Sequence, residues 1–450
     1  MNTKKLCVVL LIILTSMAII FAQGTDEADS GKKTILKVAH IYDEVAEENG
    51  GYSWFEKVKE DFEAQNPNVE VQFENFEWNQ IDVKMMQDFR SGITSHDVTM
   101  STPQIYPQHS AVGDLADLAP FVAKDWSDSE KADFSWASTY QQGIINGQQI
   151  AIPMGSHSRI VMYNKEMFEA AGLDSSRGPQ SIDELIEDAM KLTIDKDGDG
   201  TIDQYGLAMT VGPDRGTIEL TFAPLLWNFG GELWDTENMK ADFASEAGIK
   251  TTELIWDLLN KYKVVPPTAI VNSNYDTLFN GSVNDKAAII FGWGSYWIGG
   301  LQEKGYVKGV CPPTVDAELT KVGFEDYPTT SKSGFANSWS LSIYKNSENK
   351  DLAWKFINCA LNADKLKSYP DAGLPIRKSA WDSPEYQTEY YNKYFSAIEK
   401  AKPMPRTPYY GELADVVFAA LQNCVNADRG DIPEILAKAQ KEFNTKFAGK

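Results

Sequence analysis

Residues 147–173, with the sequence GQQIAIPMGSHSRIVMYNKEMFEAAGL, decide the fold of this chain. One apolar run meets Pro153 and two small residues, and a second apolar run then leads into a predicted helix. Asn164 is a favourable N-cap for that helix, and Gly172 supplies the left-handed residue that ends it. The chain is therefore predicted to run as strand, kink, strand and capped helix, with a crossing from structure to structure that no long linker interrupts.

The N-terminal segment has the pattern of an export signal followed by a polar linker. Two lysines precede an apolar run at residues 6–21, and Ala22 is a small residue that suits cleavage. An uncleaved membrane helix is the alternative, but the apolar run is short for a full span. No small residue precedes Cys7, so the sequence lacks the cleavage box of lipoproteins. We therefore predict a signal peptide at residues 1–22, a linker at residues 23–33, and a periplasmic or secreted protein.

Composition limits the class of protein. The 450 residues are 43% hydrophobic and 24% charged, with a formal net charge of −22. This length suits two or three domains. So acidic a chain lacks the basic surface that nucleic acid or anionic membrane would need. Beyond the predicted signal, Cys311, Cys359 and Cys424 allow one disulfide with a free thiol or none, and no Cys/His spacing suits zinc.

The first unit shows an alternation of strands and helices. Strands are predicted at residues 35–39, 69–73 and 97–100, and a helix at residues 54–64 ends before an Asn-Pro pair. This β-α-β order implies a mainly parallel sheet with helices on its faces.

The alternation restarts after the crossover. The capping box Ser181-Ile-Asp-Glu184 opens one helix, a second helix covers residues 244–262, and an apolar strand lies at residues 287–291. Residues 307–313 suggest the return to the first unit, which a strand at residues 340–344 and the helix after it would complete.

Three segments carry a wider resemblance: IPMGSHSRIVMYNK at residues 152–165, FGWGSYW at 291–297 and GLPIRKS at 373–379. In this order they resemble the extracellular solute-binding proteins, the family of maltose- and other sugar-binding receptors that feed ABC importers. The resemblance implies an α/β fold of the periplasmic binding protein-like II type, with two lobes of discontinuous chain, a hinge, and a ligand cleft between the lobes. Under this interpretation lobe 1 comprises residues 34–153 plus 310–365, and lobe 2 comprises residues 154–309 plus 366–450.

The most specific local motif is Asp195-Lys-Asp197-Gly-Asp199-Gly-Thr201-Ile-Asp203. Its carboxylates at positions 1, 3, 5 and 9, its glycine at position 6 and the Thr201 carbonyl at position 7 match a calcium loop of the EF-hand type. Position 12 is a glycine instead of the usual bidentate glutamate, so a further ligand is needed. A solvated turn is the alternative. Because clustered carboxylates repel each other without a cation, we predict a structural Ca²⁺, as in similar loops of the family resembled.

Aromatic side chains are the first candidates for ligand contact. Sugars present apolar C–H faces that stack on rings, and hydroxyls that need polar partners. The sequence offers Trp227, Glu232, Trp293, Trp297 and Trp339 for these roles. Burial in the core is an equally good interpretation of each Trp. Trp293 stands between two glycines at the end of a predicted strand and is the strongest candidate.

Further candidates follow from the resemblance. In similar proteins the loop after the first strand, here with Tyr42 and Glu44, faces the cleft. So do Trp78 and the turn after the third strand, which includes Gln104. His157 stands where the crossover enters the second lobe, at a position that is acidic in some disaccharide receptors, so the substrate is not transferred by resemblance.

Arg377, in the GLPIR turn, is expected either to give bidentate hydrogen bonds to a ligand or to pair with a neighbouring acid. Together these features predict a monomeric substrate-binding component of an ABC importer, which binds a mono- or oligosaccharide and presents it to the permease subunits without chemistry. The alternatives are a receptor for a polyamine or metal complex and, less favoured, a secreted glycoside hydrolase. The sequence has no GxSxG, HExxH or P-loop motif, but a hydrolase needs only two carboxylates.

Overall fold

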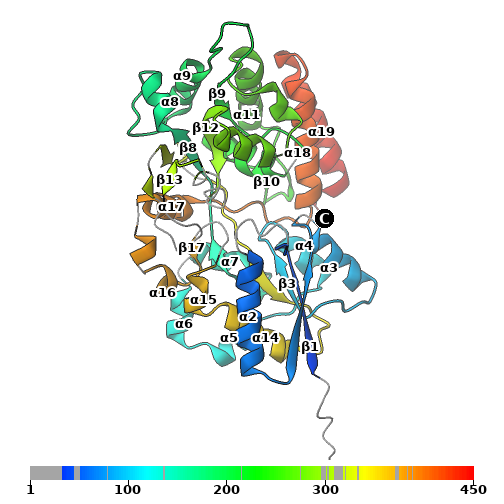
Figure 1. Ribbon diagram of the computed structural model, residues 1–450. Coiled ribbons are helices and arrows are strands. Elements are labelled where there is room, and N and C mark those ends of the chain that lie inside the picture. Colours follow the sequence, from blue (N-terminus) through cyan, green and yellow to red (C-terminus); the bar gives the residue numbers. More distant parts are fainter. Residues whose placement is uncertain are drawn as a thin grey trace, which may run out of the picture.

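The chain folds into two α/β lobes, stacked one above the other in Figure 1. The computed structural model describes residues 33–44, 51–78, 80–134, 137–213, 215–273, 275–294, 301, 304–308, 318–319, 321–331, 334–369, 374–382, 384–387 and 389–449. The predicted signal peptide and nearly all of the predicted linker lie outside these residues. None of the helices in this part of the chain is long and apolar enough to cross a membrane.

The first lobe is built on a five-stranded sheet with the order β2-β1-β3-β16-β6. Its strands are β2 (Val69–Asn75), β1 (Thr34–His40), β3 (Val98–Ser101), β16 (Ser340–Ile343) and β6 (Ile152–Pro153). β1 runs parallel to β2 and β3, as the β-α-β order predicts, whereas β16 runs antiparallel to β3 and β6. The carboxyl ends of β1, β2 and β3 therefore share one edge of the sheet, where α/β proteins bind ligands.

Helices cover this sheet. They are α2 (Gly51–Gln65), α3 (Ile81–Arg90), α4 (Tyr106–Val112), α5 (Ala119–Asp125), α6 (Asp128–Asp133), α7 (Ala137–Gln142), α14 (Lys350–Ala360), α15 (Ala363–Leu366) and α16 (Lys378–Trp381). α2 buries Trp54, Phe55, Val58 and Phe62, whose spacing places them on one helical face. That face packs on α14, which comes from a distant part of the sequence.

The second lobe has a four-stranded sheet with the order β15-β8-β12-β9. Its strands are β15 (Val322–Glu325), β8 (Ile160–Asn164), β12 (Ala287–Trp293) and β9 (Tyr205–Ala208). Every residue of β8 and β12 is buried, which explains their continuous apolar sequence. The helices of this lobe are α8 (Lys165–Ala170), α9 (Ile182–Leu192), η1 (Thr217–Phe222), α10 (Ala223–Asn228), α11 (Glu246–Trp256), η2 (Asp257–Lys261), η3 (Pro267–Ile270), η4 (Tyr275–Phe279), α12 (Asn280–Val283), α18 (Tyr410–Val425), η7 (Arg429–Asp431) and α19 (Ile432–Phe447).

Several segments of the chain pass between the lobes, and these segments lie next to one another. β7 (Gly155–Ser156) pairs with β17 (Leu374–Pro375), and His157 forms a bridge with Asn337. Phe335 bridges in turn to Lys402, in the segment between α17 (Glu389–Lys400) and α18. The predicted crossover at residues 147–173 is thus the first of these passages. Smaller elements are β4 (Ile144–Ile145), β5 (Gln148–Gln149), β10 (Trp234–Asp235), β11 (Lys240–Ala241), β13 (Val307–Lys308), β14 (Glu318–Leu319) and η6 (Pro384–Tyr386).

The strand pairing differs from the predicted lobe boundaries in two places. β15, assigned to lobe 1 from the sequence, pairs with β8 of the second sheet. Conversely, Arg377 was assigned to lobe 2, but it forms a bridge with Phe134 in the first lobe. The expected return near residue 310 is therefore too early, because β15 completes the second sheet before the chain enters β16. Because β15 and β8 are far apart in the sequence, the residues around β15 could not indicate this pairing.

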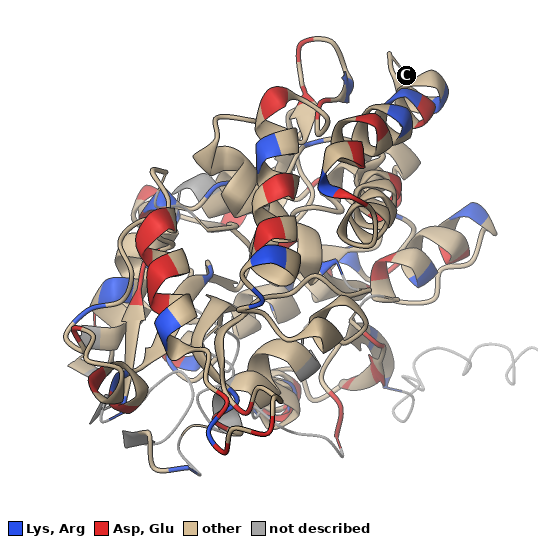
Figure 2. Ribbon diagram, turned by 90° about the horizontal axis from the view of Figure 1, so that it is seen from above, with Lys and Arg blue, Asp and Glu red and all other residues tan. Residues whose placement is uncertain are grey.

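Charge is spread over the surface. Figure 2 shows Lys and Arg interspersed with Asp and Glu along several helices.

Candidate functional site

A cavity of about 470 Å³ lies between the two lobes. Trp78 and Gln80 line it from the first lobe, in the turn between β2 and α3. The second lobe contributes the remaining lining residues: Pro213, Arg215, Ala414, Asp415 and Phe418. Trp78 is 45% exposed, which is a large fraction for the bulkiest apolar side chain. The turn that carries it follows a parallel strand at the edge of the sheet where α/β proteins hold ligands.

Glu219 joins the lobes beside α4 and α18. The Gln104 amide donates from Nε2 to Glu219 Oε1 over 3.4 Å, and the Tyr410 hydroxyl donates to the same oxygen over 3.0 Å. Burial, followed by the charge of Glu219, raises the pKa of Tyr410 well above its ordinary value, so the phenol stays a donor. Gln104 Oε1 is buried and accepts no hydrogen bond from the described residues. Gln104 therefore offers an acceptor at the junction of the lobes.

His157 lies in the crossover and is 3% exposed. Arg159 Nη1 lies 2.8 Å from His157 Nδ1. A guanidinium only donates, so Nδ1 must accept and the proton of the neutral ring sits on Nε2. Burial, with the nearby charge of Arg159, lowers the pKa of His157 well below its usual value. Within the described part of the chain Nε2 has no hydrogen-bond partner, which leaves a buried N–H donor near the junction.

Trp227 and Glu232 meet in the second lobe, away from the cavity lined by Trp78. Trp227 Nε1 donates to Glu232 Oε2 over 3.1 Å, and Lys402 Nζ lies 5.4 Å from the centre of the Trp227 ring. Trp227 is 5% exposed and packs in the core of the second lobe. Glu232 instead lines a separate surface cavity of about 410 Å³ that includes Phe229 and Asp242.

The two other described Trp candidates pack within the protein. Trp293 is fully buried, with its ring centre 6.0 Å from that of Phe324. Gly292 has φ +97°, and the strand register shifts between Phe291 and Trp293, so a bulge re-aims the indole. Trp339 is half-buried and packs against the first core. Trp297 lies outside the described residues.

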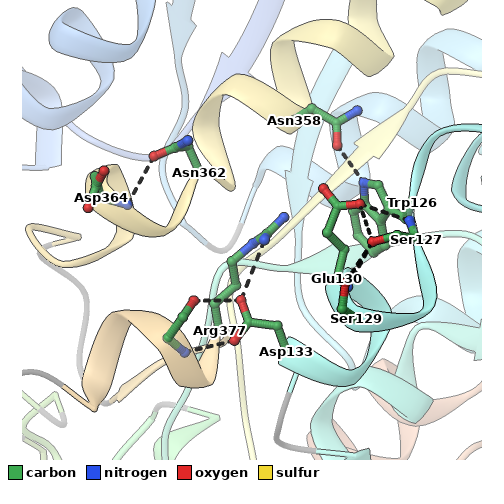
Figure 3. A network of polar contacts seen from close by, with 10 residues as sticks. Trp126, Ser127, Ser129, Glu130, Asp133, Asn358, Asn362, Asp364 and Arg377 are labelled. Carbon is green, nitrogen blue, oxygen red and sulfur yellow. Dashed lines mark hydrogen bonds and ion pairs between the residues drawn. The ribbon is translucent and has the colours of Figure 1, made fainter.

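Tyr42, Glu44 and Arg377 do not line the cavity. The hydroxyls of Tyr42 and Tyr369 lie 3.0 Å apart in a buried contact, and Glu44 is exposed. Arg377 Nη1 lies 3.5 Å from Asp133 Oδ2, and its guanidinium stacks 4.9 Å from the Phe134 ring centre. Figure 3 shows this pair at the end of α6. Of the two interpretations of Arg377, pairing with a neighbouring acid describes its contacts here.

Of the described candidates, Trp78 alone lines the interlobe cavity, whereas Gln104 makes a contact between the lobes and His157 lies in the first connecting passage. Sequence reasoning missed Gln80 of the first lobe and the following residues of the second lobe: Arg215, Glu219, Tyr410, Asp415 and Phe418. Phe418 is half-buried and lies off the strongly buried face of α18. An aromatic residue in this position is the one local signal that α18 contributes to the cavity.

The predicted calcium loop brings three carboxylates together. Oxygens of Asp195, Asp197 and Asp203 lie within 4.8 Å of one another. Both oxygens of Asp195 accept backbone N–H groups, from Gly198 at 2.7 Å and Gly200 at 2.8 Å. The N–H groups, led by that of Gly200, lower the pKa of Asp195 and favour the charged form that binds a cation.

The glycine at position 12 of the loop, where the EF-hand pattern has a glutamate, has a structural cause. An added Cβ at Gly206 would lie 1.9 Å from the carbonyl oxygen of Ala189 in α9. The last position of the loop therefore cannot carry a carboxylate side chain. The carboxylates present fit part of a site for a hard cation such as Ca²⁺, and further oxygen ligands are needed to complete it.

Two lobes with separate sheets, several connecting passages and a cavity between them define a periplasmic-type binding protein. The sequence profile described as bacterial extracellular solute-binding protein matches residues 46–367. The chain belongs to this family.

Individual relatives agree with the assignment. A probable amino-acid ABC transporter periplasmic-binding protein of Sinorhizobium fredii is 26% identical over 73% of this chain and 70% of its own length. A solute-binding protein of Thermotoga lettingae, solved with α-D-tagatose, has a TM-score of 0.75 at 21% identity, over 92% of this chain and 99% of that one. The maltose-bound MalE3 of T. maritima has a TM-score of 0.73 at 22% identity, over 91% of this chain and 99% of that one. The two solved structures establish the fold.

Proposed function

We propose that this protein is the substrate-binding component of an ABC importer and binds a carbohydrate or polyol between its lobes. The observation that carries the proposal is the interlobe cavity, which combines the rings of Trp78 and Phe418 with the polar groups of Gln80, Arg215 and Asp415. Aromatic faces suit the C–H surface of a sugar, and the polar groups suit its hydroxyls.

The charge of the lining supports a neutral ligand. Among the described lining residues, Arg215 and Asp415 contribute one positive and one negative group, a balance that suits a neutral ligand better than a polyamine or metal complex. Relatives solved with maltose, tagatose and ribitol support the same class of ligand. The printed name of the Sinorhizobium relative instead favours an amino acid, which the opposite charges of Arg215 and Asp415 would also suit. A zwitterionic ligand is therefore the second candidate.

The proposed mechanism is closure without covalent chemistry. The passages at β7, β17 and the His157–Asn337 bridge would act as the hinge. Ligand that contacts both lobes binds the closed form more tightly and shifts the population toward it. The closed monomer, exported by its signal peptide, would then dock on the permease subunits. The contact between Gln104 and Glu219 belongs to the closed form in this scheme.

The test is isothermal titration of the mature protein with maltose, D-tagatose, ribitol, L-glutamine and spermidine, followed by chromatography of the mixture. Binding of a sugar or polyol that is recovered intact supports the proposal. Binding of glutamine or spermidine alone would favour the alternatives, and a consumed sugar would make the protein a hydrolase. Trp78→Ala should weaken binding, whereas Trp256→Ala should not, because Trp256 is half-buried in α11 and hydrogen-bonded to the Ala427 carbonyl.

We also propose that the loop at Asp195, Asp197 and Asp203 binds one structural Ca²⁺, with Asp199 and the Thr201 carbonyl as further oxygen donors. The support is the convergence of three carboxylates within 4.8 Å in a sequence with EF-hand spacing. The ion would tie the end of α9 to the start of β9, because the loop joins these two elements.

A further inference from the structure

The first lobe contains a buried histidine between two carboxylates. His109 Nδ1 lies 2.9 Å from Asp114 Oδ2, and Nε2 lies 2.9 Å from Asp82 Oδ1. His109 and Asp114 have no exposed surface, and Asp82 is 7% exposed. Carboxylates accept hydrogen bonds, so both ring nitrogens must donate, and the ring is an imidazolium.

The cluster continues to the end of β3. Ser101 Oγ donates to Asp82 Oδ1 over 2.6 Å, so this oxygen accepts from both Ser101 and His109. Ser101 pairs directly with Ser340 of β16, and Thr99 pairs with Ser342. Because paired residues of antiparallel strands share a face, this side of the sheet presents four hydroxyls toward α3 and α4. The interface between the sheet and these two helices is polar at its centre.

Such an arrangement is a poor way to gain stability. Two carboxylates and one imidazolium leave a net negative charge in the interior, and their desolvation offsets most of the attraction between them. Apolar side chains of similar volume would stabilise the interface at least as well. Directional hydrogen bonds do what apolar contacts cannot, because they fix the relative position of the groups that they join.

The elements that the cluster joins are those that present the interlobe groups of the first lobe. Asp82 is in the first turn of α3, directly after Trp78 and Gln80. His109 is in α4, the helix that follows the turn with Gln104. The Gln104 amide contacts Glu219 of the other lobe. Asp114 follows α4, and its carboxylate accepts a hydrogen bond from Nδ1 of His109.

We infer that His109 is a positioning residue for the ligand cleft: by bridging Asp82 and Asp114, it fixes the Trp78–Gln80 turn relative to the Gln104 turn. This inference rests on the proposed function for its effect on binding, but not for its effect on the two turns. The imidazolium acts through Asp82 and touches neither the cavity nor the ligand. Loss of the bridge should therefore loosen both turns in the folded protein.

The test compares His109→Gln and Asp114→Asn with the control His96→Gln. His96 is also a buried histidine of the first lobe with a carboxylate partner, since Nε2 lies 2.8 Å from Glu74 Oε2. Two measurements are made on folded protein: hydrogen exchange of the peptides covering residues 78–84 and 101–109, and titration with maltose, D-tagatose and ribitol. A third observable is the pair of downfield imidazole N–H signals expected in the proton NMR spectrum of the wild type.

We expect His109→Gln to raise exchange at least fivefold in both peptides and to weaken binding of the sugar probe at least fivefold. Asp114→Asn should change both in the same direction, and His96→Gln should leave both within twofold of wild type. A folded His109→Gln protein with wild-type exchange in the two peptides and wild-type affinity would overturn the inference. If His109→Gln does not fold, Asp114→Asn decides by the same criteria. If the wild type binds none of the probes, the proposed ligand class fails, and hydrogen exchange still decides the positioning role.

Discussion

Arg159 donates a hydrogen bond over 2.8 Å to Nδ1 of His157, in the first passage of the chain between the lobes. The guanidinium fixes the tautomer of the imidazole and holds it neutral, because a second positive charge beside it in a buried site is unfavourable. His157 is thus a rigid donor at Nε2 whose charge does not change near neutral pH.

His157→Ala should weaken ligand binding by about 1–3 kcal/mol, the range for a lost hydrogen bond to a buried polar group. Because the pKa of His157 lies well below 6.5, the affinity of the wild type should be flat between pH 6 and 8. Titration calorimetry across that range measures both. A tenfold change of wild-type affinity between pH 6 and 8 would contradict the neutral donor.

Two tryptophans should respond oppositely to truncation. Trp78 is 45% exposed at the cavity, so Trp78→Ala should leave the melting temperature nearly unchanged and weaken binding by about 1–3 kcal/mol. Trp293 is fully buried, so Trp293→Ala should lower the free energy of unfolding by about 3–5 kcal/mol. Urea unfolding and calorimetry on the same preparations separate the two effects. A Trp78→Ala protein that binds like wild type would remove Trp78 from the site.

Local features of the fold were predictable because neighbouring residues decide them. Asn164 accepts a hydrogen bond from the Met167 N–H, and Ser181 accepts one from the Glu184 N–H, so both predicted N-caps are confirmed. Gly172 has φ +71°, as its place after a helix predicts. The strand at residues 97–100 forms with a shift of one residue as β3.

The site was predicted only from its first-lobe side. Trp78 and Gln104 were implied by the family resemblance, and both follow parallel strands at the edge of the sheet where α/β proteins bind ligands. Asp415 and Phe418 reach the same cavity from α18, more than three hundred residues further along the chain, and the only local signal is that Phe418 lies off the buried face of this helix. Trp293 was the strongest candidate from the sequence, but the bulge at Gly292 turns its ring inward.

His109 should make stability fall at alkaline pH. Its hydrogen bonds to Asp114 and Asp82 outweigh the cost of burial and raise its pKa from 6.5 to about 10. The folded protein then binds one more proton than the unfolded chain between these values, so the free energy of unfolding decreases as pH rises from 6.5 to about 10. Urea unfolding at several pH values should show this slope in the wild type and not in His109→Gln. Parallel curves for the two proteins would contradict the raised pKa.

His40 should make stability fall at acidic pH. Burial lowers its pKa from 6.5 to about 4. Here the unfolded chain binds the extra proton, so stability is full above pH 6.5 and falls as pH decreases toward 4. His40→Gln should flatten this part of the urea-unfolding profile, while His109→Gln serves as the control, because His109 is a buried histidine whose pKa is raised instead of lowered. An acid limb equally steep in His40→Gln and wild type would assign the loss to the carboxylates instead.

Removal of calcium should destabilise the second lobe. A cation that binds only the folded loop adds to stability by mass action, so EDTA should lower the melting temperature and excess Ca²⁺ should restore it. Asp195→Asn removes the carboxylate that both neighbouring N–H groups orient, and it should abolish this response. Asp174→Asn is the matched control, because Asp174 also accepts a backbone N–H, from Ser176, but stands outside the carboxylate cluster. Equal melting temperatures of the wild type in EDTA and in Ca²⁺ would leave the loop as a solvated turn, since the N–H groups already around Asp195 can hold its shape without an ion.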